Sequence, residues 1–600
     1  MIENNIKLLI DRYPNLRDYK YLDNPLMEIV ETKSKDLTCR YNGLYIHSKY
    51  SPQNEAKKLA KEVQKSNLII LGGFGLGYLA QEISEIHKDA IIIIYEPNMN
   101  LFMEALKVRD FSILFNNNRV KVLVGQTPES IKDYLIPRYI KTIKYVPLKN
   151  RTRGFEDLFE PVESIIRLYL KRLRINRNTL LKFGKLWVKN QSRNLPLMGY
   201  KSNIDSIFGK FSNIPGIIIS AGPSMELIIP YLKVLKDRFL LLAVDTALKS
   251  LLAEGIEPDF VMSIDSQFWN AKHLEGAKTD KTILIADSSI QPSALREFKE
   301  RVYFTQSTFP LGKYFEKVRS PFPKIASGGS VSTNIWDFAN KLGLSKIFFI
   351  GQDLGYPGNI THYKNSYFEN NMLLNSNRIN SIETQSFNYI YRGYPTKVLS
   401  NNGDLILSDK RMGIYIDWFT EKIKLQNSNN SFSLSPNGCK IDGIEYKDIE
   451  ELLNYPLVIE EKSFLLNKLN KIDKNFFLPQ ILDSAIQFKH SLEKVITLAD
   501  KAYNICLVIE ENFKKSLQVN QLLKELTIID QTITSYSHSQ TLSFIIEPFI
   551  NEITESQQGT ALEGLKLSEN LYKEIVNTGR LHIKYLNQSI STIDRTLKDK

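Results

Sequence analysis

Short apolar runs alternate with longer segments of helical periodicity between residues 215 and 265. Three such runs occupy residues 216–219, 239–244 and 260–264, and each is followed by small or acidic polar residues. Alternation of this kind is typical of parallel strands joined by crossover helices. Because ligands bind beyond the carboxyl ends of the strands in such sheets, the polar residues after the runs predict one shared binding edge.

The predicted binding edge has an earlier and a later half. The polar residues after the three runs are Ser220, Gly222, Pro223, Ser224, Asp245, Thr246 and Asp265. A later strand-like run at 346–350 ends in Gly351, Gln352 and Asp353, and His362 follows in a polar loop. We therefore expect both halves to contribute to one site.

Two loops rich in glycine and serine precede helical patterns in this region. They are Gly222-Pro223-Ser224 and Ser327-Gly328-Gly329-Ser330. Backbone N–H groups at a helix N-terminus bind phosphate, so two such loops at strand-to-helix junctions of one sheet predict a site for a nucleotide phosphate. The Ser224 hydroxyl is expected to cap its helix, and Pro230 to kink that helix or delay its start.

Three carboxylates, those of Asp245, Asp265 and Asp353, end strand-like runs. Carboxylates at such positions bind sugar hydroxyls, hold a divalent metal or act as bases, and the alternative is that each caps the helix after it. Residues 265–267 lack a D-x-D metal motif. His362 is expected to have a pKa near neutrality, which suits a general base for an acceptor hydroxyl, and the alternative is a surface-loop histidine. The other six histidines receive no role.

The N-terminal region has its own strand-and-helix pattern. A strand at 67–71 leads to Gly73-x-Gly75-x-Gly77, a helix at 78–86, and a second strand that ends in Glu96. The glycine spacing differs from the dinucleotide pattern G-x-G-x-x-G. Two interpretations remain open: a structural turn in a degenerate Rossmann-like domain, or a ligand site in which Glu96 binds a ribose hydroxyl.

The order of these patterns predicts an α/β protein with two Rossmann-like domains followed by an all-α domain. The expected segments are an N-terminal α/β domain (1–154), a basic helical connector (155–200), a central α/β domain (201–445) and a C-terminal helical domain (446–600). Residues 365–402 read as an insertion or lid. In the C-terminal segment, apolar residues recur in steps of four and three from Ile481 to Phe513, which predicts one long amphipathic helix.

Net charge, cysteine count and the lengths of the apolar runs limit the classes of protein to which the chain can belong. The chain has 600 residues and a net charge of +12, with basic residues concentrated between 138 and 193. That stretch is either a solvated helical face or a surface for phosphates or nucleic acid. Three cysteines are too few for a disulfide framework or a metal cluster. No apolar run approaches the ~20 residues of a membrane-spanning helix, so we expect a cytoplasmic protein without a membrane partner.

Several longer stretches resemble one family, the motility-associated factor glycosyltransferases of flagellated bacteria. The matching stretches are SAGPSM (220–225), AVDTALKSLLAEGIEPDFVMSID (243–265), IGQDLGYPGNITHY (350–363), FGKLWVKNQSRNL (183–195), GGFGLGY and IYEPN. They cover most of residues 67–365. The central domain of this family is similar to certain bacterial sialyltransferases.

The resemblance implies transfer of a nonulosonic acid, such as pseudaminic or legionaminic acid, from a CMP-activated donor to serine or threonine hydroxyls of flagellin. It implies inversion at the anomeric carbon, with no metal or other cofactor and no nucleic-acid partner. The catalytic residues would be His362, as the base, and Asp353. Tyr356, Tyr363 and Tyr367 would donate to the departing phosphate. The residues expected to hold the donor are Ser220, Gly222, Pro223, Ser224, Asp245, Thr246, Asp265, Ser327, Gly328, Gly329, Ser330 and Gln352.

Two other functions fit the same sequence. Archaeal pterin diphosphokinases share the central domain and would use ATP and Mg²⁺, with Asp245, Asp265 and Asp353 as metal ligands. A flagellin-binding chaperone without catalytic activity would instead use the helical C-terminal segment. Stabilisation by CMP, by ATP with Mg²⁺, or by flagellin alone distinguishes the three functions.

Overall fold

The computed structural model divides into two compact units, Met1–Thr179 and Leu180–Lys600. The division falls within the predicted connector, and the finer segment boundaries stay predictions. Among the residues that the structure describes, no helix is long and apolar enough to cross a membrane. The described residues are 2–10, 27–136, 140, 142–199, 204–298, 301–307, 309–318, 322–426, 429–470, 476–512, 516–535 and 561–599.

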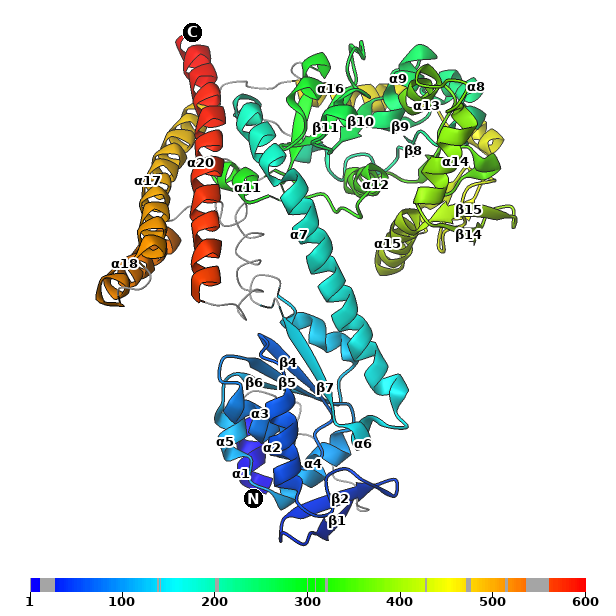
Figure 1. The fold of residues 1–600 in the computed structure, drawn as a ribbon. Coiled ribbons are helices and arrows are strands. Elements are labelled where there is room, and N and C mark those ends of the chain that lie inside the picture. Colours follow the sequence, from blue (N-terminus) through cyan, green and yellow to red (C-terminus); the bar gives the residue numbers. More distant parts are fainter. Residues whose placement is uncertain are drawn as a thin grey trace. The chain divides into compact units, whose positions relative to one another are not determined.

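The first unit contains two sheets (Figure 1). The smaller sheet is antiparallel and consists of β1 (Glu28–Glu31), β2 (Leu37–Tyr41) and β3 (Leu44–Tyr45). The larger sheet is parallel, in the order β6 (Val120–Val124), β5 (Ile91–Glu96), β4 (Leu68–Gly72), β7 (Ile143–Pro147). The helices are α1 (Ile2–Ile10), α2 (Pro52–Glu62), α3 (Tyr78–Ile86), α4 (Met99–Val108), α5 (Ser112–Asn116), η2 (Pro128–Tyr134) and α6 (Lys149–Thr152).

The second unit is organised on an eight-stranded, all-parallel sheet. Its order is β12 (Val302–Thr305), β11 (Ile283–Asp287), β10 (Phe260–Ser263), β9 (Leu240–Val244), β8 (Gly216–Ile219), β13 (Ile347–Ile350), β16 (Ser431–Ser433), β17 (Glu445–Tyr446). The chain runs from β8 outward to β12 and then returns to place β13 on the other side of β8. The direction of winding therefore changes between β8 and β13, which is where open α/β sheets bind ligands.

The connections in this sheet are helical, as the sequence predicts. Between β8 and β13 they are α8 (Met225–Leu235), α9 (Asp245–Ala253), α10 (Phe268–Ala271), η4 (Pro292–Phe298), α11 (Pro310–Glu316) and α12 (Val331–Leu342), and η3 (Ile204–Ile207) precedes β8. Strands β8, β9, β11 and β13 are buried along their whole length. Burial on both faces explains why they read as uninterrupted apolar runs in the sequence.

An insertion lies between β13 and β16, and Figure 1 labels its elements α13, α14, β14, β15 and α15. Its hairpin pairs β14 and β15 antiparallel. The elements are η5 (Pro357–Asn359), α13 (Tyr367–Leu374), α14 (Ile382–Arg392), β14 (Pro395–Leu399), β15 (Leu405–Asp409) and α15 (Lys410–Gln426). The isolated bridge between Tyr356 and Leu407 joins this hairpin to the segment that follows β13.

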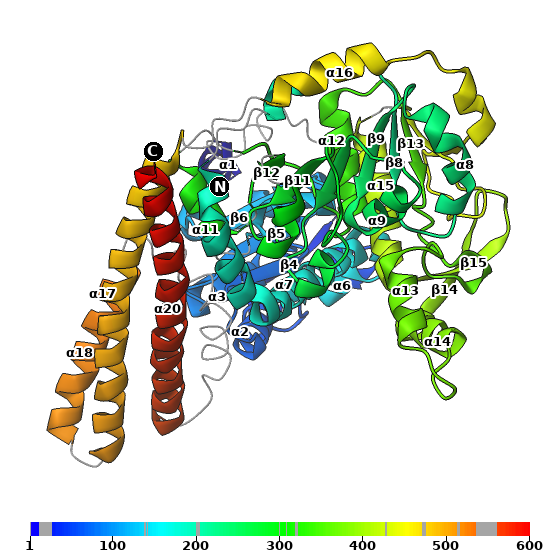
Figure 2. The same ribbon diagram turned by 90° about the horizontal axis from the view of Figure 1, so that it is seen from above.

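The described residues after β17 contain helices and no strand. They form η6 (Ile449–Asn454), α16 (Ile459–Asn467), η7 (Lys468–Asn470), α17 (Leu478–Glu511), α18 (Ser516–Ser535) and α20 (Ala561–Lys598). Helices α17 and α20 lie side by side in both views (Figures 1 and 2). The apolar residues from Ile481 to Ile509 are buried in the core of this helical tail, as predicted, whereas Phe513 lies outside the described residues.

Helix α7 (Glu156–Met198) begins in the first unit and ends in the second. Its C-terminal half carries buried amides that hold the loops after β10, β11 and β12. Asn190 donates to the carbonyls of Ser266 and Ser289, both at 2.9 Å. Asn194 donates to the carbonyl of Ser288 at 3.0 Å. The connector helix is therefore part of the framework of the predicted binding edge.

The sequence places the loop Ser327-Gly328-Gly329-Ser330 at a strand-to-helix junction, but the described residues 322–330 contain no strand. Residues 325–330 form a loop before α12, and their backbone N–H groups bond to side chains of that helix. The N–H of Ala326 donates to Asp337 at 2.8 Å, and that of Gly328 donates to Thr333 at 2.8 Å. The second glycine and serine loop therefore precedes a helix as expected, but the predicted strand before it is wrong.

Candidate functional site at the carboxyl edge of the large sheet

The loops that follow β8 and β13 are tied together by hydrogen bonds. Gly222 donates its backbone N–H to the carbonyl of Gly351 at 2.8 Å. The backbone N–H of Ser224 donates to the Asp353 carboxylate at 3.0 Å, and the N–H of Gly351 donates to the Ser224 hydroxyl at 3.0 Å. These residues come from the two halves of the predicted edge, which the structure brings together at the change in winding direction.

The predicted cap by Ser224 is wrong, and of the two effects expected of Pro230 the delayed helix start is not seen. Ser224 has helical backbone angles and makes no side-chain capping bond, because its hydroxyl is used by Gly351 and by the Ser435 hydroxyl at 2.6 Å. The N–H of Ser224 bonds to Asp353 instead. Helix α8 begins at Met225 and contains Pro230 in its interior, so the proline does not delay the start of the helix.

Asp353 belongs to the framework of the site. Its side chain is buried, which raises the pKa of the carboxyl, while hydrogen bonds from Ser224 and Ser435 oppose that shift. Ser224 lies in the loop after β8, and Ser435 lies in the loop after β16. Asp353 thus holds the loop after β8 through its Oδ2 atom, while its Oδ1 atom is buried without a hydrogen-bond partner among the described residues, and its catalytic role stays a prediction.

Two predicted donor-binding residues have polar atoms that are ready for a ligand. The hydroxyl of Ser220 and the Oε1 atom of Gln352 are buried and have no hydrogen-bond partner in the part of the chain that the structure describes. Ser220 follows β8 and Gln352 follows β13. A buried polar atom without a partner is costly, so a bound molecule with hydrogen-bond donors would satisfy both positions.

Asp245 organises the neighbouring ends of β9 and β10. Its buried carboxylate accepts hydrogen bonds from the Ser263 hydroxyl at 2.7 Å, from Asn270 Nδ2 at 2.8 Å and from the backbone N–H of Thr246 at 2.8 Å. Burial raises the pKa of this carboxyl, and the hydrogen bonds from Asn270 and Ser263 oppose the rise. Thr246, a predicted ligand residue, thus contributes its backbone to this cluster.

His273 joins the Asp245 cluster, although the sequence interpretation assigned it no role and no acidic partner. Burial lowers its pKa, and the charge of Asp245 acts in the opposite direction. Its ring lies 5.2 Å from that of Tyr367, edge to face. Its Nδ1 atom is buried without a hydrogen-bond partner among the described residues. The sequence carried no signal for this pairing, because Asp245 and His273 follow different strands.

His362 is half-buried close to His273. Its ring packs on Phe368 with 4.2 Å between centroids, and its Nδ1 lies 3.2 Å from the Thr361 hydroxyl. Burial is the main cause that lowers the pKa of His362 to about 4, and repulsion from Arg411 and from His273 in its protonated form acts in the same direction. The expected near-neutral pKa is therefore wrong. The imidazole is neutral at pH 7 and can still accept a proton.

The His362 segment is fixed above the loop after β8. The backbone N–H of Tyr363 donates to the carbonyl of Ala221 at 2.8 Å. The backbone N–H of His362 donates to Glu369 at 3.2 Å, and the Thr361 hydroxyl donates to the same carboxylate at 2.6 Å. His362, His273 and the loop after β8 therefore form one neighbourhood.

The remaining predicted residues lie at the margins. Asp265 is half-buried, accepts hydrogen bonds from Gln267, and acts electrostatically on His273. In the second glycine loop the Ser330 hydroxyl caps α12 through the N–H of Ser332. Gly328 packs on α15, since a Cβ atom there would lie 2.6 Å from the Trp418 ring. The second glycine loop contacts α12 and α15. These contacts differ from the contacts that Asp245 and His362 make.

The three tyrosines expected to contact a phosphate have different surroundings. The Tyr356 hydroxyl is buried and donates to Asp409 at 2.8 Å, which contradicts its expected role. Tyr363 is buried, and its hydroxyl accepts a weak bond from Asn365 at 3.4 Å. Tyr367 packs on His273, and the Nζ atom of Lys249 lies 5.4 Å from the centroid of the Tyr367 ring. Tyr367 alone lies against the site described above.

The arrangement of the three aspartates bears on metal binding. Asp245, Asp265 and Asp353 each bond to separate local partners. Within the described ranges, no three His, Cys, Asp or Glu side chains converge as ligands for a metal ion. The ligand set expected for Mg²⁺ is thus not assembled by these residues.

The glycine loop of the first unit is filled by the side chains of the unit itself. A Cβ atom on Gly75 would overlap the His47 ring, and one on Gly73 would lie 2.6 Å from Arg151 Cγ. His47 Nε2 accepts the N–H of Leu76 at 2.8 Å, and burial lowers the pKa of His47 to about 3. Glu96 pairs with Arg151 at 2.5 Å, and both side chains are 1% exposed. This geometry favours the structural turn over the ligand site.

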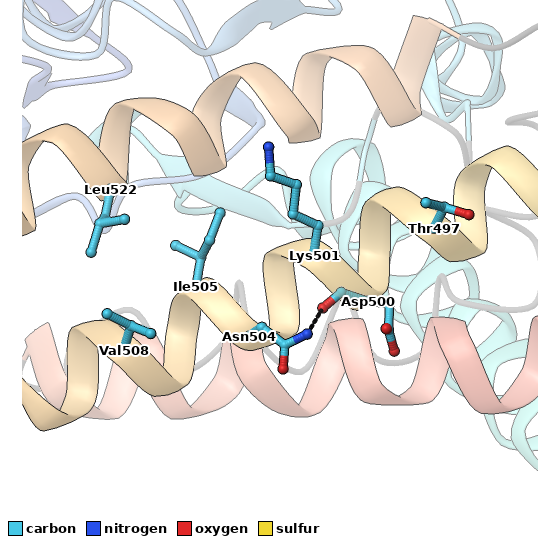
Figure 3. Close-up of a pocket in the computed structure, with 7 residues that line it drawn as sticks. All are labelled: Thr497, Asp500, Lys501, Asn504, Ile505, Val508 and Leu522. Atoms are coloured by element: carbon cyan, nitrogen blue, oxygen red, sulfur yellow. Dashed lines mark hydrogen bonds between the residues drawn. The ribbon is translucent and has the colours of Figure 1, made fainter.

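Two surface cavities have measurable volumes. One of about 610 Å³ lies in the insertion. The other, of about 390 Å³, lies on the helical tail between α17 and α18 (Figure 3). Its lining contains none of the predicted site residues, and its Lys501 forms an ion pair with Glu525 at 2.6 Å. The lining residues of the tail cavity are Thr497, Asp500, Lys501, Asn504, Ile505, Val508 and Leu522.

Comparison with known proteins supports the architecture. A solved structure of the MAf glycosyltransferase from Magnetospirillum magneticum AMB-1 superposes with a TM-score of 0.62, covering 99% of this chain and 95% of that one at 16% identity. The chain has the fold of that glycosyltransferase. The predicted fold class, with parallel α/β sheets and a helical C-terminal region, is confirmed.

Sequence relatives and a family model add a second comparison. The model of a family described as 6-hydroxymethylpterin diphosphokinase MptE-like matches residues 189–359. Three uncharacterized proteins of Treponema pallidum (strain Nichols) are 28%, 25% and 22% identical over 33%, 39% and 63% of this chain. The aligned regions span 59%, 85% and 66% of those proteins. The residues matched by the family model lie in the unit that carries the site.

Proposed function

We propose that this protein is a glycosyltransferase that moves a nonulosonic acid from a CMP-activated donor to serine or threonine hydroxyls of flagellin. The observation that carries the proposal is the shared fold with the MAf glycosyltransferase, which extends over 99% of this chain. The sequence motifs that resemble the motility-associated factor family agree with it. On this proposal the reaction takes place in the cytoplasm, before flagellin is exported.

The donor nucleotide is proposed to bind at the change in winding direction of the large sheet. Ser220 and Gln352 present buried polar atoms without partners there. The loops around them are held by the bonds from Gly222 to Gly351 and from Ser224 to Asp353. A rigid framework of this kind places binding groups before the ligand arrives, which lowers the entropic cost of binding.

His362 is proposed to accept the proton of the acceptor hydroxyl. Its Nδ1 is next to the Thr361 hydroxyl, which leaves Nε2 for the substrate. As the acceptor oxygen bonds to the anomeric carbon, the bond from that carbon to the phosphate oxygen breaks and its electron pair leaves with CMP. The neutral His273, with its unpartnered Nδ1 and the Asp245 charge behind it, is suited to hydrogen-bond the reacting groups.

Co-expression provides the direct test. Flagellin is expressed in cells that make a CMP-nonulosonate, with this protein or with its His362→Ala variant, and intact-mass spectrometry measures the mass added to flagellin. The proposal expects one or more nonulosonate masses with the wild type only. Unmodified flagellin in the presence of folded wild-type protein and donor would contradict it. Stabilisation by flagellin alone, without CMP binding, would favour the chaperone function.

A second candidate function is supported by the family model over residues 189–359. A pterin diphosphokinase would transfer the diphosphate of ATP to a pterin alcohol with Mg²⁺. The three carboxylates, those of Asp245, Asp265 and Asp353, accept hydrogen bonds from different neighbouring groups. This arrangement does not favour a shared magnesium site. Thermal stabilisation by ATP with Mg²⁺ but not by CMP would select this function.

A further inference from the structure

The insertion contains a cavity of about 610 Å³, a volume in the ordinary range for small-molecule sites. It lies among α13, α14, β15 and the start of α15, elements that Figure 1 shows as neighbours. The lining residues are Met372, Asn380, Gln385, Asn388, Tyr389, Arg392, Gly393, Asp409 and Arg411. Most of these side chains carry polar groups that can bond to a polyhydroxylated ligand.

The charge of this cavity is positive. Asp409 is its one acid, and the Asp409 carboxylate is already bonded to Arg411 at 2.9 Å, to the Tyr356 hydroxyl at 2.8 Å and to the N–H of Met412 at 2.8 Å. Arg392, at the end of α14, has no ion-pair partner among the described residues. Because Asp409 is already paired with Arg411, the guanidinium of Arg392 is left to bind an anion.

Tyr389 connects this cavity to His362. Its ring lines the cavity and lies 6.3 Å from the His362 ring. Arg411 donates to the Tyr389 hydroxyl at 3.3 Å and lies 5.5 Å from the ring centroid. Phe368 packs against both His362 and Tyr389. A molecule in the cavity would therefore be adjacent to the proposed base.

We infer that this cavity binds the carboxylate-bearing sugar of the donor, with Arg392 as its main contact. A guanidinium matches a carboxylate in shape and charge, and the amides of Asn380, Gln385 and Asn388 suit sugar hydroxyls. The inference rests on the proposed function and extends it, because it separates a sugar subsite in the insertion from the nucleotide subsite at β8 and β13.

The donor's phosphate has similar anion chemistry, so the test must distinguish the two groups. Isothermal titration calorimetry measures the affinities of CMP and of CMP-N-acetylneuraminate, which carries the sugar carboxylate, for the full chain. The variants are Arg392→Gln and Arg392→Lys. Lys397→Gln is the matched control, because Lys397 is an exposed cation on the neighbouring β14 and does not line the cavity.

Arg392→Gln is expected to weaken CMP-N-acetylneuraminate binding about 10- to 100-fold, the loss typical of a charged hydrogen bond. CMP affinity should stay within about twofold, Arg392→Lys should recover part of the loss, and Lys397→Gln should change neither affinity. Arg392 is exposed, so the melting temperature should not move. Equal weakening of both ligands would place the phosphate in the cavity and overturn the inference.

Other outcomes separate the inference from the proposed function. If the wild type binds both ligands and Arg392→Gln changes neither, the sugar subsite is wrong and the proposed function stands. If the wild type binds CMP-N-acetylneuraminate no more tightly than CMP, the inference is again overturned. If the wild type binds neither ligand but binds ATP with Mg²⁺, the proposed function itself is wrong.

Discussion

The carboxylate of Asp353 accepts the backbone N–H of Ser224 at 3.0 Å, although the two residues are 129 positions apart. This bond joins the loop after β8 to the loop after β13, where the winding of the sheet changes direction. The Ser224 hydroxyl completes the connection through the N–H of Gly351. The nucleotide half of the proposed site therefore depends on two loops that hold each other in place.

The tight approach of these loops makes Gly222 a sensitive position. A Cβ atom there would overlap both the Asp353 carboxylate and the backbone carbonyl of Gly351. We expect Gly222→Ala to lower the free energy of unfolding by about 1–3 kcal/mol, the usual cost of an added group in a packed site, and to abolish CMP binding. Urea unfolding and calorimetry measure the two effects.

Gly413 provides the matched control for that substitution. It lies inside α15, and nothing lies within 4 Å of its Cβ position. Gly413→Ala should stabilise the protein by about 0.5–1 kcal/mol, because alanine loses less backbone entropy in a helix. Equal stability of the Gly222 and Gly413 variants would contradict the assigned role of the loop.

His362→Ala is expected to reduce turnover by about 10²–10⁴-fold, the range for loss of a general base, with CMP affinity unchanged. His490→Ala is the control, since the His490 side chain is 67% exposed on α17. Because the pKa of His362 is about 4, the imidazole is unprotonated above that value. The wild-type rate, measured as flagellin modified per minute, should thus show no acid limb near pH 6.5. A limb at that pH would argue for a different base.

Asp287 makes stability depend on pH. Burial at the end of β11 raises its pKa from 3.8 to about 6. Between these values the folded chain binds more protons than the unfolded chain, so the contribution of this group to stability falls as pH rises. Asp287→Asn removes the titration. Relative to wild type, the variant should gain up to about 3 kcal/mol between pH 4 and pH 7 in urea unfolding. A constant difference across this range would show that the carboxyl does not titrate there.

The Glu96 and Arg151 pair is the clearest test of the first unit. Both side chains are 1% exposed, so Glu96→Gln leaves a buried guanidinium without its charge partner. We expect a loss of about 3–5 kcal/mol in the free energy of unfolding. Glu28→Gln, which breaks the exposed pair with Arg40, should cost less than about 1 kcal/mol. A loss of similar size in both variants would contradict a structural role for the Glu96 pair.

Sequence reasoning succeeded where each residue type reflects local structure. Buried parallel strands such as β8 and β13 are continuous apolar runs, and α17 shows its buried face as steps of three and four. The hairpin β14–β15 gave no such signal because most of its residues are exposed or half-buried. The strand expected before α12 is absent from residues 325–330, because the N–H groups of this loop bond to α12 side chains instead of a neighbouring strand.

The candidate site was only partly visible in the sequence. Ser220, Asp245, Gln352, Asp353 and His362 were found because polar residues follow apolar runs. Their chemical roles were not readable, since burial and partners decide them. The pKa of His362 is lowered mainly because the folded chain buries the ring, and to a smaller extent because His273 and Arg411, from other segments, disfavour its protonation.

By itself, the sequence determined the succession of strands and helices and the edge at which polar residues gather, because these follow from local periodicity. Tertiary structure alone decided which of those residues are framework and which remain open to a ligand. The Oδ2 atom of Asp353 accepts the N–H of Ser224, whereas Ser220 Oγ, Gln352 Oε1 and Asp353 Oδ1 are buried without partners in the described part of the chain. The physical reason is that a polar group's chemistry depends on its hydrogen-bond partners and its desolvation, and both are set by segments distant along the chain.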